Sequence, residues 1–148
     1  MDLYDRLKPL AFRFDAEAAH GIGHHVLEAV QSTPIERVLA DACTVVDARL
    51  RTEAFGQTFG NPVGVAAGFD KNAEVPNALA ALGFGHVEIG GVTAEPQAGN
   101  PRPRLFRLSE DEALVNRMGF NNDGADVIGD RLDALEARVP IGVNIGKS

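Results

Sequence analysis

Three short apolar runs set the strongest limit on how this chain can fold. They are VGVAAG at 63–68, HVEIG at 86–90 and IGVNIG at 141–146, and their small and β-branched residues are typical of strands buried on both faces of a sheet. The segments 72–82 and 125–138 lie between these runs and carry apolar residues at helical spacing. Strand–helix–strand–helix–strand is the alternation of an α/β protein with a parallel sheet.

Small and polar residues follow each of the three runs. AAGFDK occupies 66–71, GGVT occupies 90–93 and NIGKS occupies 144–148. The carboxyl ends of parallel strands meet at one edge of a sheet, where α/β proteins bind their ligands. Glycine and alanine let a ligand approach the backbone, and amide side chains bond neutral ring edges, so we expect a flat, polar ligand at this edge.

The first 44 residues have the patterns of short helices. Leu3, Leu7 and Leu10 share one helical face, and Pro9 ends or kinks that segment. Two further helices are predicted, the first capped by Asp15 and the second starting at Thr33-Pro34 with Glu36 at N3. The apolar residues at helical spacing in the helix capped by Asp15, expected to pack inward, are Ala19, Ile22, Val26 and Val30. Together with Tyr4, Phe12 and Phe14, these helices have the pattern of ordinary packing, and a docking surface stays open as the alternative.

The remaining segments predict hairpins and one more helix. Residues 45–62 suggest two short strands joined by a turn, and 104–117 suggest a second hairpin. The inward residues expected in helix 125–138 are Val127, Ile128, Leu132 and Leu135. We interpret Cys43 as a small buried hydrophobe. The basic cluster is interpreted as a solvated face or a set of ion pairs, and consists of Arg102, Arg104 and Arg107.

Charge and composition exclude several classes of protein. The 148 residues carry a net charge of −7, which argues against a nucleic-acid surface. No run of the chain approaches the roughly 18 apolar residues of a membrane span, and the N-terminus does not have the pattern of a signal peptide. The single cysteine indicates a reducing interior. The four histidines share no metal-ligand spacing with Asp, Glu or Cys, so we predict no metal.

The segment NRMGFNN at 116–122 places three amides around an apolar pair. Spacing alone allows a polar turn in which the side chains of Met118 and Phe120 pack into the core. It also allows a recognition loop, in which the amides bond a neutral ring edge while the apolar pair excludes water.

Four motifs together resemble the dihydroorotate dehydrogenase family. They are NPVGVAAGFDKNAE, GFGHVEIGGVTAEPQAGNPRPRLFRL, NRMGFNNDG and IGVNIGKS, in colinear order along the chain. The helices before them resemble the class 2, quinone-linked type. The resemblance implies an FMN-containing (β/α)8 TIM barrel, of which 45–148 would be the first three βα units. Residues 1–44 would be a helical extension that docks to quinone and to the cytoplasmic side of the cell membrane as a peripheral surface contact.

The resemblance also implies roles for particular residues. Lys71 would contact both the flavin and the substrate, dihydroorotate. The other flavin contacts would be Ala67, Gly68, Phe69, Asp70, Gly91 and Asn144. The substrate segment would be Asn116, Arg117, Met118, Gly119 and Phe120, while Asn121 and Asn122 would shape the turn. No catalytic residue is assigned, because the base of class 2 enzymes is a serine on a later loop that Ser148 does not match.

Two departures from the family pattern stand out. Gly91 replaces the usual threonine, so a backbone contact or Thr93 would take over the lost hydroxyl contact. A closed barrel takes about 250 residues, so we expect this chain to be the N-terminal part of a longer protein and inactive alone. The alternatives are a soluble class 1 enzyme, against which 1–45 argues, and an inert half-barrel scaffold. A dihydrouridine synthase would need a basic surface for tRNA, which the charge of −7 opposes.

Overall fold

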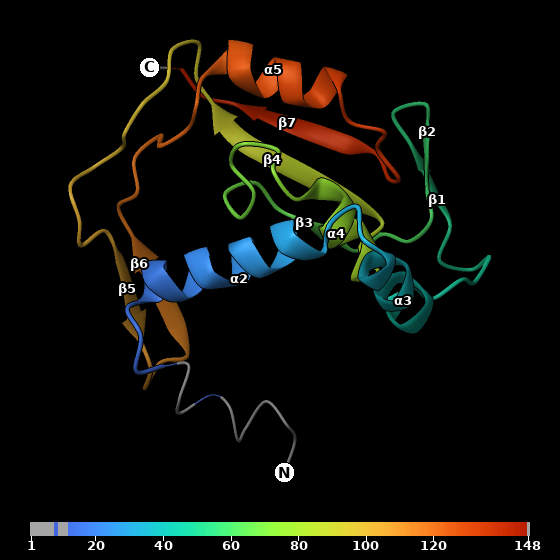
Figure 1. Cartoon of the computed structure of the whole chain (residues 1–148), viewed down its shortest axis with the longest axis horizontal. Coiled ribbons are helices and arrows are strands. Elements are labelled where there is room, and N and C mark those ends of the chain that lie inside the picture. Colours follow the sequence, from blue (N-terminus) through green and yellow to red (C-terminus); the bar gives the residue numbers. More distant parts are fainter. Residues whose placement is uncertain (1–7, 9–11, 148) are drawn as a thin grey trace.

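A three-stranded parallel sheet forms the centre of the molecule (Figure 1). The computed structural model describes residues 8 and 12–147. The sheet has the order β3-β4-β7, with β3 at Gly64–Val65, β4 at His86–Val92 and β7 at Ile141–Ile145. Val65 pairs with Val87 and Ile89 pairs with Val143, so the three predicted strands and their direction are confirmed.

Two strands differ from the expectation. The run 63–68 contributes only two residues to the ladder, because the chain leaves it at Ala66 and returns near β4, where the Gly90 amide donates to the Asp70 carbonyl at 3.3 Å. The prediction that β7 is buried is wrong, since Val143 is 44% and Ile145 is 83% exposed. Among the described residues, β7 is the outer strand of its sheet, so one of its edges has no partner strand there.

Two helices cover the sheet and close the core. They are α4 at Pro76–Ala81 and α5 at Ala125–Asp133. The core consists of Ala73, Val75, Ala78, Leu79, Val87, Ile89, Val92 and Ile128. Helix α4 is shorter than the predicted 72–82, because the preceding residues form a turn held by the Asp70 carboxylate. In α5, Ile128 is buried as predicted, whereas Val127 is 43% exposed and the inward prediction for it is wrong.

Helix α2, Ala16–Val30, lies alongside this unit and begins as predicted. The Asp15 carboxylate accepts from the amides of Glu17 and Ala18, both at 3.0 Å. The predicted inward face is wrong for Ile22 and Val26, which are 55% and 57% exposed, whereas Ala19 and Val30 are half-buried. The face that packs inward combines Leu27 with polar side chains, including the buried His24, so apolar spacing alone could not identify it.

Helix α3, Pro34–Cys43, follows the predicted start at Thr33 and Pro34. Its capping differs from the expected pattern, since the Glu36 carboxylate accepts from the Ser32 amide and the Thr33 hydroxyl bonds the Val30 carbonyl. Cys43 is exposed, so its interpretation as a buried hydrophobe is wrong. The predicted face of Leu3, Leu7 and Leu10, together with Tyr4, lies outside the described residues.

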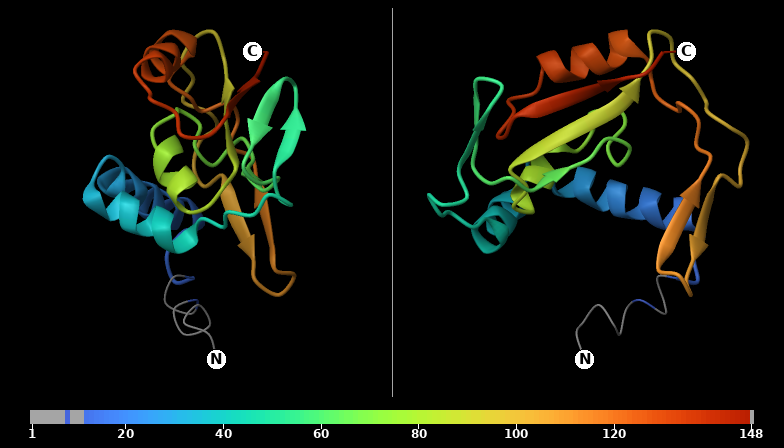
Figure 2. Two further views of the ribbon diagram at one scale, coloured as in Figure 1. Left: turned by 90° about the vertical axis from the view of Figure 1, so that its right-hand side faces the viewer. Right: turned by 180° about the vertical axis from the view of Figure 1, so that it is seen from behind.

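Both predicted hairpins are present (Figure 2). One joins β1, Thr52–Ala54, to β2, Gln57–Phe59, and the other joins β5, Leu105–Leu108, to β6, Ala113–Asn116. The β5–β6 hairpin crosses the first turns of α2, at the far end of that helix from α3 (Figure 1). Across 8 and 12–147, no helix is long and apolar enough to cross a bilayer.

Candidate active site at the strand ends

The loop after β3 separates its side chains between two directions. Gly68 has a φ of +105° and lies at an exposed point, where an added Cβ would meet no atom within 4 Å. The Phe69 ring turns toward α2 and meets the His20 ring edge-on, with 4.9 Å between ring centroids. The fully buried Asp70 carboxylate accepts from the amides of Glu74 and Val75, both at 2.9 Å. Any ligand above this loop would therefore meet backbone at 67–70.

Lys71 is the cation of this loop, and it is half-buried. Its Nζ donates to Asn121 Oδ1 at 2.9 Å. Burial lowers the pKa of Lys71, and the nearby positive charge of Arg104 lowers it further. The side chain lines a cavity of 220 Å³ that Met118 and Asn121 also line. A lysine in this setting can pair with one carboxylate of a small ligand.

Three predicted residues converge at the ends of β4 and β7. A Cβ added at Gly91 would lie 3.3 Å from Asn144 Oδ1 and 3.4 Å from the Phe120 ring. One at Gly146 would lie 2.7 Å from the same ring. The Asn144 amide donates to Glu88 Oε1 at 3.2 Å, and both Asn144 and Phe120 are exposed. The strand ends thus form an open platform of small residues, bordered by one amide and one aromatic ring.

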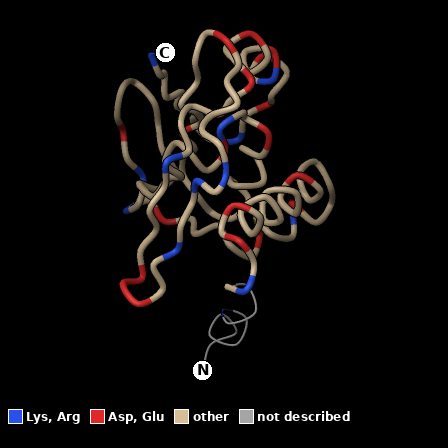
Figure 3. The backbone as a smooth tube through the Cα atoms, turned by 90° about the vertical axis from the view of Figure 1, so that its left-hand side faces the viewer, with Lys and Arg blue, Asp and Glu red and all other residues tan. Residues whose placement is uncertain are grey.

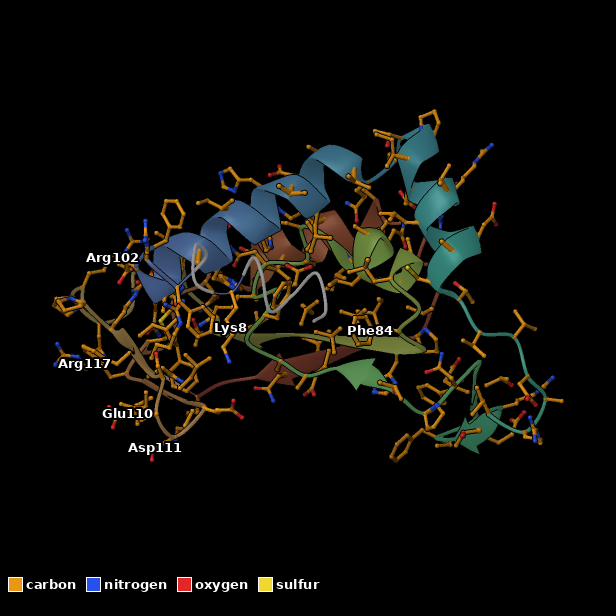
Figure 4. The ribbon with its side chains drawn as sticks, turned by 90° about the horizontal axis from the view of Figure 1, so that it is seen from below. Lys8, Phe84, Arg102, Glu110, Asp111 and Arg117 are labelled. Carbon is orange, nitrogen blue, oxygen red and sulfur yellow. The ribbon has the colours of Figure 1, made fainter. Side chains whose placement is uncertain are left out.

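The predicted substrate segment 116–120 divides into two parts. Met118 and Phe120 face the Lys71 cavity and the strand ends, respectively. Asn116 and Arg117 belong to the outer hairpin, where the Arg117 guanidinium donates to the Pro103 carbonyl at 3.0 Å. Figure 4 shows Arg117 at the outer edge of the molecule. The structure therefore does not bring the side chain of Arg117 to the site.

Gly119 and Asn122 fix the course of this segment. Gly119 has a φ of +70°, and a Cβ there would lie 3.1 Å from the Asn100 amide. The buried Asn122 side chain accepts from the amides of Thr93 and Gly124 and donates to the Phe120 carbonyl at 2.6 Å. The prediction that Asn122 shapes the turn is confirmed. Asn121 instead contacts Lys71, a role that the sequence did not indicate.

Two of the three clustered arginines, Arg102 and Arg104, form ion pairs, which confirms that interpretation for them, whereas Arg107 donates to the carbonyls of Phe12 and Phe14. The Arg104 side chain is 8% exposed and pairs with Glu17 of α2 through Nη2 at 2.8 Å. Arg102, on the surface, reaches the same carboxylate at 3.0 Å. The hydrogen bond from Arg104 lowers the pKa of Glu17. Basic residues lie along this junction, while Glu110 and Asp111 form the acidic tip of the hairpin (Figures 3 and 4).

A second cavity of 570 Å³ lies between the start of α2 and the β5–β6 hairpin. Its lining includes Phe12, His20, Leu105, Arg107 and Leu114. The Arg107 guanidinium carbon lies 4.3 Å from the centroid of the Phe12 ring. Burial lowers the pKa of His20, which keeps this imidazole neutral at pH 7. His20 also lines the Lys71 cavity, so one neutral ring borders both spaces.

A parallel α/β sheet with a lysine, an amide and close-approach glycines at its strand ends defines a ligand-binding α/β protein with its site at the carboxyl edge. The chain belongs to the dihydroorotate dehydrogenase family, since residues 49–148 match the family model "Dihydroorotate dehydrogenase". This match confirms the family that the four sequence motifs indicated.

Similar proteins agree with this assignment. The chain is 74% identical over all 148 residues to "Dihydroorotate dehydrogenase (quinone)" from Natronomonas pharaonis, and 60% identical over 147 residues to a protein of the same name from Halobacterium salinarum. It spans 42% of the length of each. The structure of DHODH from Eimeria tenella in complex with ferulenol is 41% identical, with a TM-score of 0.67 over 90% of this chain and 36% of that one.

Proposed function

We propose that the protein oxidises (S)-dihydroorotate to orotate as an FMN-dependent enzyme of de novo pyrimidine synthesis, with a quinone as electron acceptor. One observation carries the proposal: Lys71 and Met118 line one cavity, and Phe120 borders the strand ends beside it. These residues occur in a chain 74% identical to a relative named as the quinone-linked enzyme. The word "quinone" in that name favours this reading over a soluble class 1 enzyme.

Residues 45–148 would form the first three βα units of a (β/α)8 barrel, and 1–44 the helical extension. The parallel order β3-β4-β7 supports this assignment, because consecutive barrel strands lie next to one another. The unpaired edge of β7 is where a further barrel strand would add.

The strand ends fit a flavin. Its flat ring needs a surface without bulky side chains, and Gly68 and Gly91 provide one, with Asn144 exposed at the border. The proposed FMN contacts are Ala67, Gly68, Phe69, Asp70, Lys71, Gly91 and Asn144. Asp70 and Phe69 would contribute backbone groups, because the Asp70 carboxylate bonds its own loop and the Phe69 ring packs on His20. When bound, FMN would accept the electron pair removed from dihydroorotate.

Lys71 and segment 116–120 would bind the substrate. The Lys71 ammonium would pair with the carboxylate of dihydroorotate, and Asn121 would hold that ammonium through its 2.9 Å hydrogen bond. Met118 and Phe120 would exclude water from the reacting ring. Asn116 and Gly119 would complete the segment through amide and backbone groups. We assign no catalytic base to this chain.

The cavity beside Phe12 and Arg107 would receive the quinone. Its apolar lining suits a hydrophobic ring, and Arg107 and the neutral His20 can each donate a hydrogen bond to a quinone oxygen. The exposed Ile22 and Val26 of α2 would rest on the cytoplasmic side of the cell membrane as a peripheral contact.

Quinone-dependent oxidation of dihydroorotate by the complete protein tests the proposal. We expect the flavin absorbance spectrum in the purified enzyme and turnover that Lys71→Ala lowers by at least about 100-fold, since an ion pair to the substrate would be lost. Arg51→Ala, which removes an exposed cation of the β1–β2 region, is the matched control and should retain full activity. Flavin-free protein, or equal turnover by Lys71→Ala, would refute the assignment.

A further inference from the structure

One cluster of potential metal ligands lies outside the groups used above. His24 comes from the inner face of α2, and Asp70 and Glu74 come from the loop between β3 and α4. His24 Nε2 lies 3.7 Å from Asp70 Oδ1 and 3.6 Å from Glu74 Oε2. One ligand atom from each residue lies within 4.8 Å of the other two. His24 and Asp70 are buried, so this cluster joins α2 to the sheet through polar atoms alone.

These separations are too long for direct hydrogen bonds, which close at about 2.7–3.2 Å. They approach the distance between two ligands of one metal ion. With bonds of about 2.1 Å, ligand atoms at octahedral or tetrahedral angles lie roughly 3.0–3.4 Å apart. Side-chain shifts of a few tenths of an ångström would bring each carboxylate to this distance from His24. The two carboxylate oxygens lie within 4.8 Å of each other and would have to approach by up to about 1.4 Å.

Hydrogen bonds already orient the Asp70 carboxylate and fix the backbone at Glu74. The Asp70 carboxylate is held on both oxygens by the amides of Glu74 and Val75, at 2.9 Å each. The Glu74 carbonyl accepts from the Gln31 side chain at 2.8 Å, which ties the loop to the end of α2. Such supporting hydrogen bonds are typical of metal ligands. His24 and Glu74 also line the 220 Å³ cavity, through which water can complete the coordination.

The charges around the cluster favour a cation. Asp70 and Glu74 contribute two carboxylates and His24 one imidazole. Arg131 Nη1 lies 3.9 Å from Glu74 Oε1 but pairs more closely with Asp123, at 2.7 Å. The 220 Å³ cavity is also lined by the fixed cations Lys71, Arg102 and Arg104, and the two arginines pair with Glu17. One nitrogen and two oxygen ligands suit zinc and related transition metals, whereas calcium and magnesium prefer oxygen ligands throughout.

We propose that His24 Nε2, Asp70 Oδ1 and Glu74 Oε2 bind one divalent transition-metal ion of the zinc type. The ion would fasten α2 to the loop that carries Lys71, with water in its remaining positions. Its role is structural, because it would join α2 to the loop between β3 and α4.

Metal binding to the complete protein tests this site without any measurement of activity. After treatment with a chelator, the protein is titrated with Zn²⁺ in competition with a chromophoric chelator. We expect one Zn²⁺ per chain, and His24→Gln or Glu74→Gln should weaken binding by at least about 100-fold, since even residues that only orient a metal ligand contribute about 10–100-fold. His25→Gln changes the exposed neighbouring histidine of the same helix and is the matched control, with unchanged affinity expected.

Cobalt provides a second measurement at the same residues. Co²⁺ added to the metal-free protein should produce visible absorption bands that His24→Gln abolishes and His25→Gln retains. Two outcomes would overturn the proposal: binding that is not stoichiometric, or an equal loss of affinity in the control. An unfolding temperature that depends on the protonation of His24 and not on Zn²⁺ would identify the cluster as an ion pair instead. Loss of quinone-dependent activity has no bearing on these readouts, so the two proposals fail separately.

Discussion

Substitution of Arg104 tests how α2 is attached to the sheet. Its guanidinium donates to Glu17 from Nε at 3.1 Å and from Nη2 at 2.8 Å. Nη1 donates to the carbonyls of Ala98 and Asn100, at 2.8 and 3.1 Å. Arg104→Ala would remove all four hydrogen bonds at once. It would leave the Glu17 carboxylate, 12% exposed, with Arg102 as its remaining cation.

The cost follows from the burial of both partners. Removing one member of a buried ion pair costs about 3–5 kcal/mol, and we expect the lower end of this range because Arg102 still compensates part of the Glu17 charge. Replacing both charged groups by methionine removes that penalty, but the two carbonyls stay without donors at about 1–3 kcal/mol each. The double variant Glu17→Met/Arg104→Met should therefore cost less than the sum of the two single variants, by about 2–3 kcal/mol.

Urea unfolding of the complete protein measures these differences in the free energy of unfolding. The unfolding midpoints report stability if the variants and the wild type have equal m-values. The pKa of Glu17 is lowered in the folded state, so its stabilisation is present above the ordinary pKa of 4.5 and is lost as the pH falls through the folded pKa. The difference in free energy of unfolding between wild type and Arg104→Ala should thus decrease below about pH 4.5. Three results would refute the reasoning: a loss of less than about 1 kcal/mol in Arg104→Ala, a double variant whose cost equals the sum of the two single variants, or a stability difference that does not change in acid.

Three further predictions concern residues around the strand ends. Lys71→Met should slow dihydroorotate oxidation yet stabilise the fold at pH 7, because burial lowers the pKa of Lys71 and the folded state at pH 7 bears the cost of burying the charged ammonium. That cost is lost as the pH rises from the folded pKa to the ordinary value of 10.5, so thermal unfolding should show a smaller gain at pH 10 than at pH 7. Asn122→Ala leaves buried amides unpaired and should cost about 2–4 kcal/mol in urea unfolding, against at most about 1 kcal/mol for Asn100→Ala, which removes one exposed hydrogen bond to the Arg117 carbonyl. Gly85→Ala places a Cβ 2.1 Å from the Asn61 carbonyl oxygen and should cost at least about 3 kcal/mol, whereas Gly56→Asn in the open β1–β2 turn should be tolerated.

The sheet and both hairpins were predictable because their signals are local. Apolar runs bounded by glycine and proline specify strands, and the end of one run fixes where the next loop starts. The exposure of β7 was not predictable, because the composition of a strand does not reveal which neighbours it has. For the same reason, 63–68 was predicted longer than the two ladder residues of β3.

The packed face of α2 shows a second limit of prediction from the sequence. Apolar periodicity selected Ile22 and Val26, but both are exposed and His24 is buried. Residues that are distant in sequence determine which face of α2 packs inward, such as Asp70, which lies beside His24. A buried polar residue is stable only with those partners, so its helix spacing carries no signal that a single sequence can reveal.

The residues of the candidate site also differ in whether the sequence could indicate them. Lys71 and Met118 were predictable from motif order, and they line one cavity. Asn121 was not, because its hydrogen bond to Lys71 joins residues 50 positions apart. Arg117 has the same local context as its neighbours, yet the hairpin turns its guanidinium to the Pro103 carbonyl.

The polar attachment of α2 explains how one helix can serve two surfaces. Its inner face meets the sheet unit through Glu17 with Arg104, His24 with Asp70, and Gln31, whose Oε1 accepts from the Asn77 amide at 3.0 Å. The hydrogen bonds at the two ends restrict rotation of the helix more strongly than apolar packing would, because each bond requires a particular orientation. Ile22 and Val26 are thereby left on the outer face, while Leu27 packs against the core. A surface that rests on a membrane through that face would hold the loop of Lys71 in a fixed orientation to it.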